Sequence, residues 1–265
     1  MITRFDHAVI AVRSLDEACR QFGRLGFDAR PGGRHTGRGT ENAIIRFGLD
    51  YIELISVYDE DEARRSGWGG AALVDYLSAH EGGLVGFCLA TDDIESQVEP
   101  LRNELPETVG PLDMQRQRPN GETLHWRLLI PGRSPWLSPY PFLIEWALAD
   151  TERLALEEPG RHDIGARAVA ALTVGALKNE LEDVRVSYRV AYELSETDRE
   201  FRLGSFGIAL VPSEAAGPKE LTIKVDDIDA SERWLTSRNI PVIRDAGGLR
   251  IDAAEACGAP MVLVA

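Results

Sequence analysis

The chain has 265 residues and a formal charge of −14, from 43 acidic and 29 basic side chains. This length allows one large or two medium domains, and a content of 44% hydrophobic and 27% charged residues is typical of globular proteins. The acidic balance disfavours proteins that bind nucleic acid or anionic membranes through a basic surface.

The sequence predicts neither a membrane span nor a disulfide framework. No stretch approaches the roughly 20 consecutive apolar residues of a bilayer-spanning helix, and residues 1–7 lack the pattern of a secretory leader. The three cysteines, Cys19, Cys88 and Cys257, are odd in number and far apart. We therefore expect a cytoplasmic protein with reduced thiols.

A weak internal repeat organises the chain. A short apolar segment ends in a few polar residues and is followed by an amphipathic helix. Copies begin near residues 5, 84, 168 and 220, and the third copy is the faintest. Asp or Ser at the junction is typical of a helix N-cap.

The first copy predicts the order β-α-β-β-β. Helical spacing runs from Leu15 to Leu25, and Gly26 stands where a glycine commonly ends a helix. Strand candidates follow at residues 27–30, 43–47 and 51–57. A short helix over 71–79 is expected in the acidic segment that leads to the second copy.

Composition divides the chain into two halves. Residues 151–165 are polar and contain Pro159-Gly160, so we interpret them as a linker. The expected domains are a module pair with the site over 1–150 and a second, degenerate module pair over 166–265. The second half is expected to pack on the first or to mediate self-association as a homodimer.

Three ionisable residues in apolar strands are candidate metal ligands. His7 lies in the first strand, Glu53 in a strand of the first unit, and Glu145 at the matching place in the second unit. A buried carboxylate is costly unless it is paired or bound to a cation, and imidazole with carboxylates suits Zn²⁺, Ni²⁺, Mn²⁺ or Fe²⁺. The alternative is a packed core histidine and two solvent-facing glutamates.

A glycine-rich segment over residues 32–42 is a second candidate feature. Its glycines permit a tight or left-handed backbone. It is either a loop shaped over a pocket, with His35, Thr40 and Asn42 as polar contacts, or a plain hairpin connection.

These features together resemble a known superfamily. The β-α-β-β-β order, with His early in strand one and Glu in strand four, is similar to the vicinal oxygen chelate superfamily, which includes glyoxalase I and extradiol dioxygenases. The segment His35-Thr36-Gly37-Arg38-Gly39-Thr40-Glu41-Asn42, followed by Tyr51-Ile52-Glu53-Leu54-Ile55, resembles more specifically its glyoxalase-like domain family.

The resemblance implies an α+β fold in which repeated β-α-β-β-β modules pair into curved, half-open barrels around a metal ion. By position, His7, Glu53 and Glu145 match the family's ligands. The fourth ligand position is occupied by Gly86, and His125 is a substitute if its side chain points inward.

Two functions stay open from the sequence. One is a divalent-metal-dependent lyase or isomerase acting on a small oxygenated substrate, with Glu145 or His35 moving the proton. The other is a metal-free small-molecule binding protein that sequesters its ligand, an alternative that Gly86 favours. Residues expected to contact the substrate are His35, Thr40, Asn42, His125 and Trp126.

Overall fold

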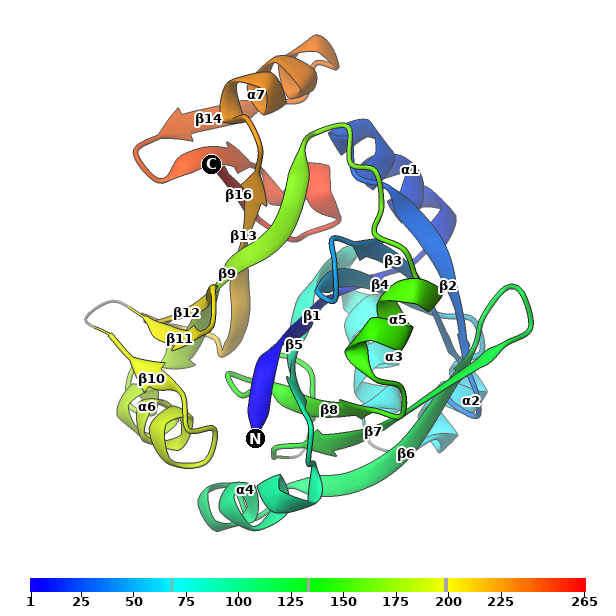
Figure 1. The fold of residues 1–265 in the computed structure, drawn as a ribbon, viewed down its shortest axis with the longest axis vertical. Coiled ribbons are helices and arrows are strands. Elements are labelled where there is room, and N and C mark those ends of the chain that lie inside the picture. Colours follow the sequence, from blue (N-terminus) through cyan, green and yellow to red (C-terminus); the bar gives the residue numbers. More distant parts are fainter. Residues whose placement is uncertain (68, 133, 198–199) are drawn as a thin grey trace.

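The computed structural model describes residues 1–67, 69–132, 134–197 and 200–265. The fold is α+β, as expected, and its strands form two sheets of eight (Figure 1). The first sheet closes into a barrel in the order β1-β4-β3-β2-β6-β7-β8-β5, where the sequence predicted a half-open one.

The barrel contains two β-α-β-β-β modules, in agreement with the internal repeat. The elements of the first module and its extension are β1 (Ile2–Val12), α1 (Leu15–Leu25), β2 (Ala29–His35), β3 (Thr40–Arg46), β4 (Tyr51–Val57), α2 (Glu60–Arg65) and α3 (Gly70–Ala79). The second module consists of β5 (Gly82–Thr91), the 3-10 turn η1 (Glu95–Gln97), α4 (Val98–Glu104), β6 (Val109–Gln117), β7 (Thr123–Ile130) and β8 (Phe142–Trp146).

Local sequence explains the first helix. The Ser14 side chain accepts a hydrogen bond from the backbone N–H of Glu17, and Gly26 ends α1 with a φ of 90°. The expected helix over 71–79 is present as α3. Strands β2 and β3 extend toward each other beyond the predicted ranges, so that the glycine-rich segment forms a hairpin.

The second sheet has the order β10-β11-β12-β9-β13-β16-β15-β14. Its elements are β9 (Ala166–Leu177), α6 (Leu181–Val190), β10 (Ser195–Glu196), β11 (Phe201–Leu203), β12 (Phe206–Ser213), β13 (Gly217–Val225), α7 (Ile228–Ser237), β14 (Val242–Asp245), β15 (Gly248–Ile251), the 3-10 turn η2 (Ala253–Ala256) and β16 (Met261–Val264).

One hydrophobic core joins the outer side of the barrel to the second sheet. Ala8 and Ile10 of β1 belong to this core, whereas Val9 and Ala11 belong to a second cluster inside the barrel. This division follows from the alternation of side chains along a strand. In the described part of the chain, no helix combines the length and apolar character needed to cross a bilayer.

The segment interpreted as a linker contains regular structure. Helix α5 (Asp150–Leu156) lies here, and in Figure 1 it is seen within the outline of the barrel. The domain division itself stays a prediction.

Candidate active site

A pocket opens inside the barrel, with mostly apolar walls and a polar floor. Its volume of about 90 Å³ exceeds what a single water needs, about 10–15 Å³. The polar lining consists of His7, His35, Arg38, Thr40, Asn42, Glu53, Ser66 and Arg116. The apolar and aromatic lining includes Tyr51, Ile55, Leu73, Met114, Trp126, Leu128, Trp136, Phe142, Ile144 and Trp146.

A β-bulge in β1 shapes the floor. The pairing of β1 with β5 shifts register between Phe5 and His7, which leaves Asp6 as the extra residue. His7 can therefore line the pocket with Asp6 beside it, and its Nδ1 lies 2.7 Å from Asp6 Oδ1. The His7 ring also stacks on Tyr51, with centroids 4.6 Å apart.

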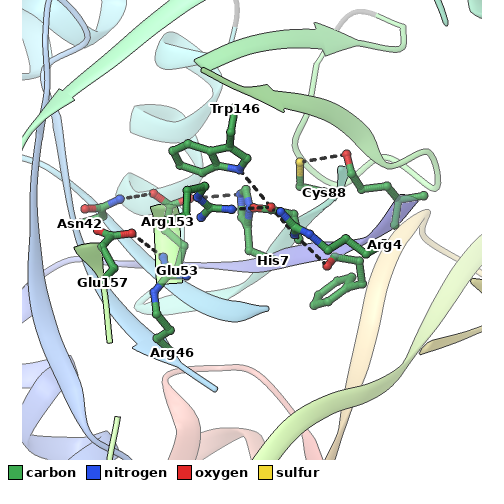
Figure 2. Close-up of polar contacts among 12 residues, drawn as sticks. Arg4, His7, Asn42, Arg46, Glu53, Cys88, Trp146, Arg153 and Glu157 are labelled. Atoms are coloured by element: carbon green, nitrogen blue, oxygen red, sulfur yellow. Dashed lines mark hydrogen bonds and ion pairs between the residues drawn. The ribbon is translucent and has the colours of Figure 1, made fainter. Parts of the chain in front are cut away.

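Asp6 is fully buried and lies in a dense polar network. Figure 2 shows how its partners Arg4, Trp146 and Arg153 point toward one another. Its Oδ2 accepts hydrogen bonds from Arg4 Nη1 at 2.7 Å, Trp146 Nε1 at 3.0 Å and Arg153 Nη1 at 3.4 Å. Burial alone would raise the pKa of Asp6, but the charge of Arg153, the hydrogen bond from His7 and the charge of Arg4 hold this pKa well below its usual range. An ionised Asp6 makes Nδ1 of His7 a donor and turns Nε2 toward the pocket.

Glu53 is the centre of the floor. Its Oε2 lies 3.6 Å from His7 Nε2, and its Oε1 lies 3.6 Å from His35 Nε2. Asn42 Nδ2 donates to Oε1 at 2.5 Å (Figure 2). The carboxylate is thus fixed by one short hydrogen bond, while both imidazole contacts exceed hydrogen-bond length.

His35 faces Glu53 as a neutral imidazole. Burial lowers the pKa of His35 to about 4, although the charge of Glu53 acts in the opposite direction. Its Nδ1 lies 2.9 Å from Thr40 Oγ1, and its Nε2 lies 3.3 Å from Asn42 Nδ2. The hairpin segment of the sequence therefore supplies three side chains that support one another.

Helix α5 and the residue after it support the floor from behind. Arg153 extends from α5 to Asp6, and its guanidinium lies 3.6 Å from the centre of the Trp146 ring. Glu157 follows α5 and accepts from Arg116 Nη2 at 2.5 Å. Arg116 Nη1 in turn donates to Asn42 Oδ1 at 3.4 Å. Two chains of contacts therefore run from this segment, one ending at His7 and the other at Glu53.

Two predicted site residues do not join this group. Glu145 and His125 are absent from the pocket lining, because Phe142, Ile144 and Trp146 take the inner face of β8 and Trp126 takes that of β7. The Glu145 carboxylate instead accepts from Arg127 Nε at 2.7 Å, and His125 is exposed. The expected convergence of Glu145 with His7 and Glu53 was therefore wrong.

The residues present do not fit the metal site that the resemblance implies. Of the matched ligands only His7 and Glu53 face each other, and Asn42 donates to the Glu53 oxygen that faces His35. At Gly86 a Cβ would lie 3.2 Å from the Trp136 ring, so this indole covers the fourth position. Among the described residues, no group of three or more His, Cys, Asp or Glu side chains is arranged to hold a metal ion.

Several site residues were not identified from the sequence. Tyr51 could have been found, because alternation places it on the face of Glu53. Asp6 could not, since a regular strand would direct it away from His7. Arg38, Arg116 and Trp136 reach the pocket only through tertiary packing.

Comparisons with known proteins agree with this architecture. The sequence model of the Glyoxalase-like domain family matches residues 5–187. No curated protein is significantly similar in sequence to the chain. Among solved structures, a hypothetical protein from Staphylococcus aureus is 18% identical with a TM-score of 0.74, over 100% of this chain and 99% of its own.

Two further structures carry names that mention chemistry. A xylose isomerase-like TIM barrel/4-hydroxyphenylpyruvate dioxygenase fusion protein is 15% identical with a TM-score of 0.57, over 92% of this chain and 40% of its own. A mutant of 4-hydroxymandelate synthase from Streptomyces coelicolor is 16% identical with a TM-score of 0.56, over 93% and 78%. At these identities the likeness shows the fold alone. The family model, however, covers more than half of the chain, and the chain belongs to the Glyoxalase-like domain family.

Proposed function

We propose that the protein is an enzyme of lyase or isomerase type that moves a proton on a small carbonyl compound held in the barrel pocket. The observation that carries this proposal is the placement of the Glu53 carboxylate 3.6 Å from each of two imidazole nitrogens, at the floor of an apolar pocket. The carboxylate and the imidazoles thus lie side by side without being hydrogen-bonded to one another, so that both can contact a substrate held above them.

The chemistry follows from the orientation of the side chains. Glu53 Oε2, as general base, takes a proton from the carbon next to the carbonyl. His7 donates a proton from Nε2 to the oxygen on which negative charge develops, in a turnover that starts with both ring nitrogens protonated, and the contact of Nδ1 with Asp6 keeps the ring oriented. In an isomerisation, Glu53 returns its proton to another carbon of the conjugated enol while the O–H proton goes back to His7 Nε2. In an elimination, the O–H proton also goes back to His7 while a group leaves the neighbouring carbon with its bonding electron pair.

Metal-dependent chemistry was the first expectation from the sequence, and the proposal does not include it. Only two of its expected ligands meet, and the positions of the others are taken by Trp136 and by the inner face of β8. The proton transfer described above needs only the side chains of the floor.

Binding without turnover is the second candidate. The indoles of Trp126, Trp136 and Trp146 all line the pocket, and such aromatic walls hold apolar ligands through stacking and burial. This function needs the walls but not the carboxylate of Glu53, which separates the two candidates experimentally.

Exchange of carbon-bound protons for deuterium tests the proposal. Small aryl ketones, aldehydes and 2-oxo acids are incubated in D₂O with EDTA, and loss of the proton signal next to the carbonyl is followed by NMR. We expect the wild-type protein to accelerate exchange of at least one compound, and Glu53→Gln to lower that rate by about 10²–10⁴-fold.

Glu145→Gln is the matched control, since this glutamate lies outside the pocket lining, and its rate should equal that of the wild type. Equal exchange rates for wild type and Glu53→Gln across all compounds would reject proton transfer. Binding that survives in both proteins would then favour sequestration.

A further inference from the structure

The pocket has a charged group at each end. Arg38 lies in the turn between β2 and β3 and lines the rim. Glu53 pairs with Ile44, which is four residues further along β3 than Thr40 at the turn. The strand register therefore places the guanidinium at the hairpin end of the barrel and the base of Glu53 deeper inside.

One contact of Arg38 is with a weak neutral acceptor, which a ligand carboxylate could replace. Its Nη1 donates to the carbonyl oxygen of Ser66 at 2.6 Å, and its Nη2 lies 3.2 Å from the thioether Sδ of Met114. A thioether is a weak acceptor, whereas a carboxylate binds a guanidinium through two stronger, parallel hydrogen bonds. Burial lowers the pKa of Arg38, and an anion beside it would stabilise its charged form.

Between the two ends the pocket is lined by polar side chains on the hairpin, His35, Thr40 and Asn42, and by apolar side chains on its other walls. Leu73, Trp126, Leu128 and Phe142 line the pocket and offer no ionised group. A ligand that meets Arg38 and Glu53 together must therefore carry an apolar body between its two polar ends.

We infer that the substrate is a small organic acid with an apolar, preferably aromatic body, whose carboxylate is bound by Arg38 while its carbonyl lies at Glu53. The place of the carbonyl rests on the proposed function, but the recognition of the carboxylate does not. The chain carries a net charge of −14, so this recognition acts locally and not through the field of the whole protein.

Two compounds that differ only in charge test this inference. 4-Acetylbenzoate carries a ketone and a carboxylate at opposite ends of a phenyl ring, and its amide replaces the carboxylate with a neutral group of similar size. Calorimetric titration should show that the acid binds the wild-type protein about 10- to 100-fold more tightly than the amide. In Arg38→Gln this preference should fall to about onefold.

Arg34→Gln is the matched control. Arg34 lies on the same hairpin, 64% exposed and 3.2 Å from Glu41, and its removal should leave the preference unchanged. Arg38→Lys keeps the charge without the planar fork and should give an intermediate preference, which keeps the test informative if Arg38→Gln folds poorly.

Three results would overturn the inference: equal affinity of acid and amide for the wild type, a preference that survives Arg38→Gln, or no binding of the acid at millimolar concentration. Glu53→Gln separates the two proposals. If it keeps the preference for the acid while wild type and variant both fail to exchange protons, the carboxylate site stands and the proposed function fails.

Discussion

His35 keeps a neutral imidazole next to a carboxylate, and this makes the free energy of unfolding depend on pH. Its folded pKa of about 4 lies below the ordinary value of 6.5, so the unfolded chain takes up this proton first as the pH falls. The contribution of His35 to the free energy of unfolding is fully present above about pH 6.5 and is lost between pH 6.5 and pH 4. The shift corresponds to on the order of 3 kcal/mol.

We therefore expect the destabilisation caused by His35→Gln to shrink as the pH is lowered from 7 to 4. The variant loses its contacts at every pH but no longer carries the group that titrates. Urea unfolding at several pH values measures this difference, with the exposed His125→Gln as control. A destabilisation that stays constant with pH would show that His35 does not have the lowered pKa.

The fate of individual residues shows how far sequence reasoning reached. Alternation correctly directs His7 and Glu53 inward, because β1 and β4 pair in unbroken register from His7 to Ala11. In β8 both faces are apolar, so nothing in Phe142 to Trp146 marks which face carries Glu145. For His125 the signal was present in the sequence, since Leu124 and Trp126 alternate with the polar residues Thr123, His125 and Arg127.

At the scale of elements, helix α5 is the least expected contributor to the site. Its sequence is polar and precedes Pro159-Gly160, which is typical of a linker. Arg153 is only 1% exposed, because Asp6 and the Trp146 ring receive its guanidinium. Burial of an arginine depends on a distant partner, and local composition cannot reveal that partner.

Arg153→Met should destabilise the protein by about 3–5 kcal/mol, since it leaves the buried Asp6 without one of its cations. Urea unfolding measures this loss. Combining it with Asp6→Asn should cost less than the sum of the two single changes, because the two groups interact directly.

Arg64→Met in α2 is the control for Arg153→Met in α5. Arg64 is 44% exposed and pairs with Asp75 on the surface. Its expected cost is at most about 1 kcal/mol. Additive effects of Arg153→Met and Asp6→Asn would indicate that α5 is attached to the barrel by packing alone.

At the scale of the whole molecule, the second half is packed against the structure that carries the pocket. Phe206 of β12 stacks on Phe5 of β1 with centroids 4.2 Å apart. Tyr192 donates from its hydroxyl to the carbonyl of Pro141, immediately before β8 and its pocket-lining Phe142. Composition predicted two halves, but the size of the core that they share depends on side chains far apart in the sequence.

This shared core predicts that both halves unfold together. Phe206→Ala removes a buried ring and should cost about 3–5 kcal/mol. In a Trp234→Phe background every remaining tryptophan precedes residue 147, so fluorescence reports on the first half alone. We expect urea unfolding followed by fluorescence to shift with Phe206→Ala and to coincide with unfolding followed by circular dichroism.

Independent unfolding of the two halves would give two separate transitions. If residues 1–150 were an independent domain, fluorescence would keep its midpoint in Phe206→Ala while circular dichroism showed an earlier, separate transition. Ile243→Ala is the matched control in the second half, because this side chain is 68% exposed and its loss should move neither signal. A single shifted transition would mean that the stability of the pocket includes the packing of the second sheet, so that changes far from Glu53 alter the fraction of competent sites without contacting the substrate.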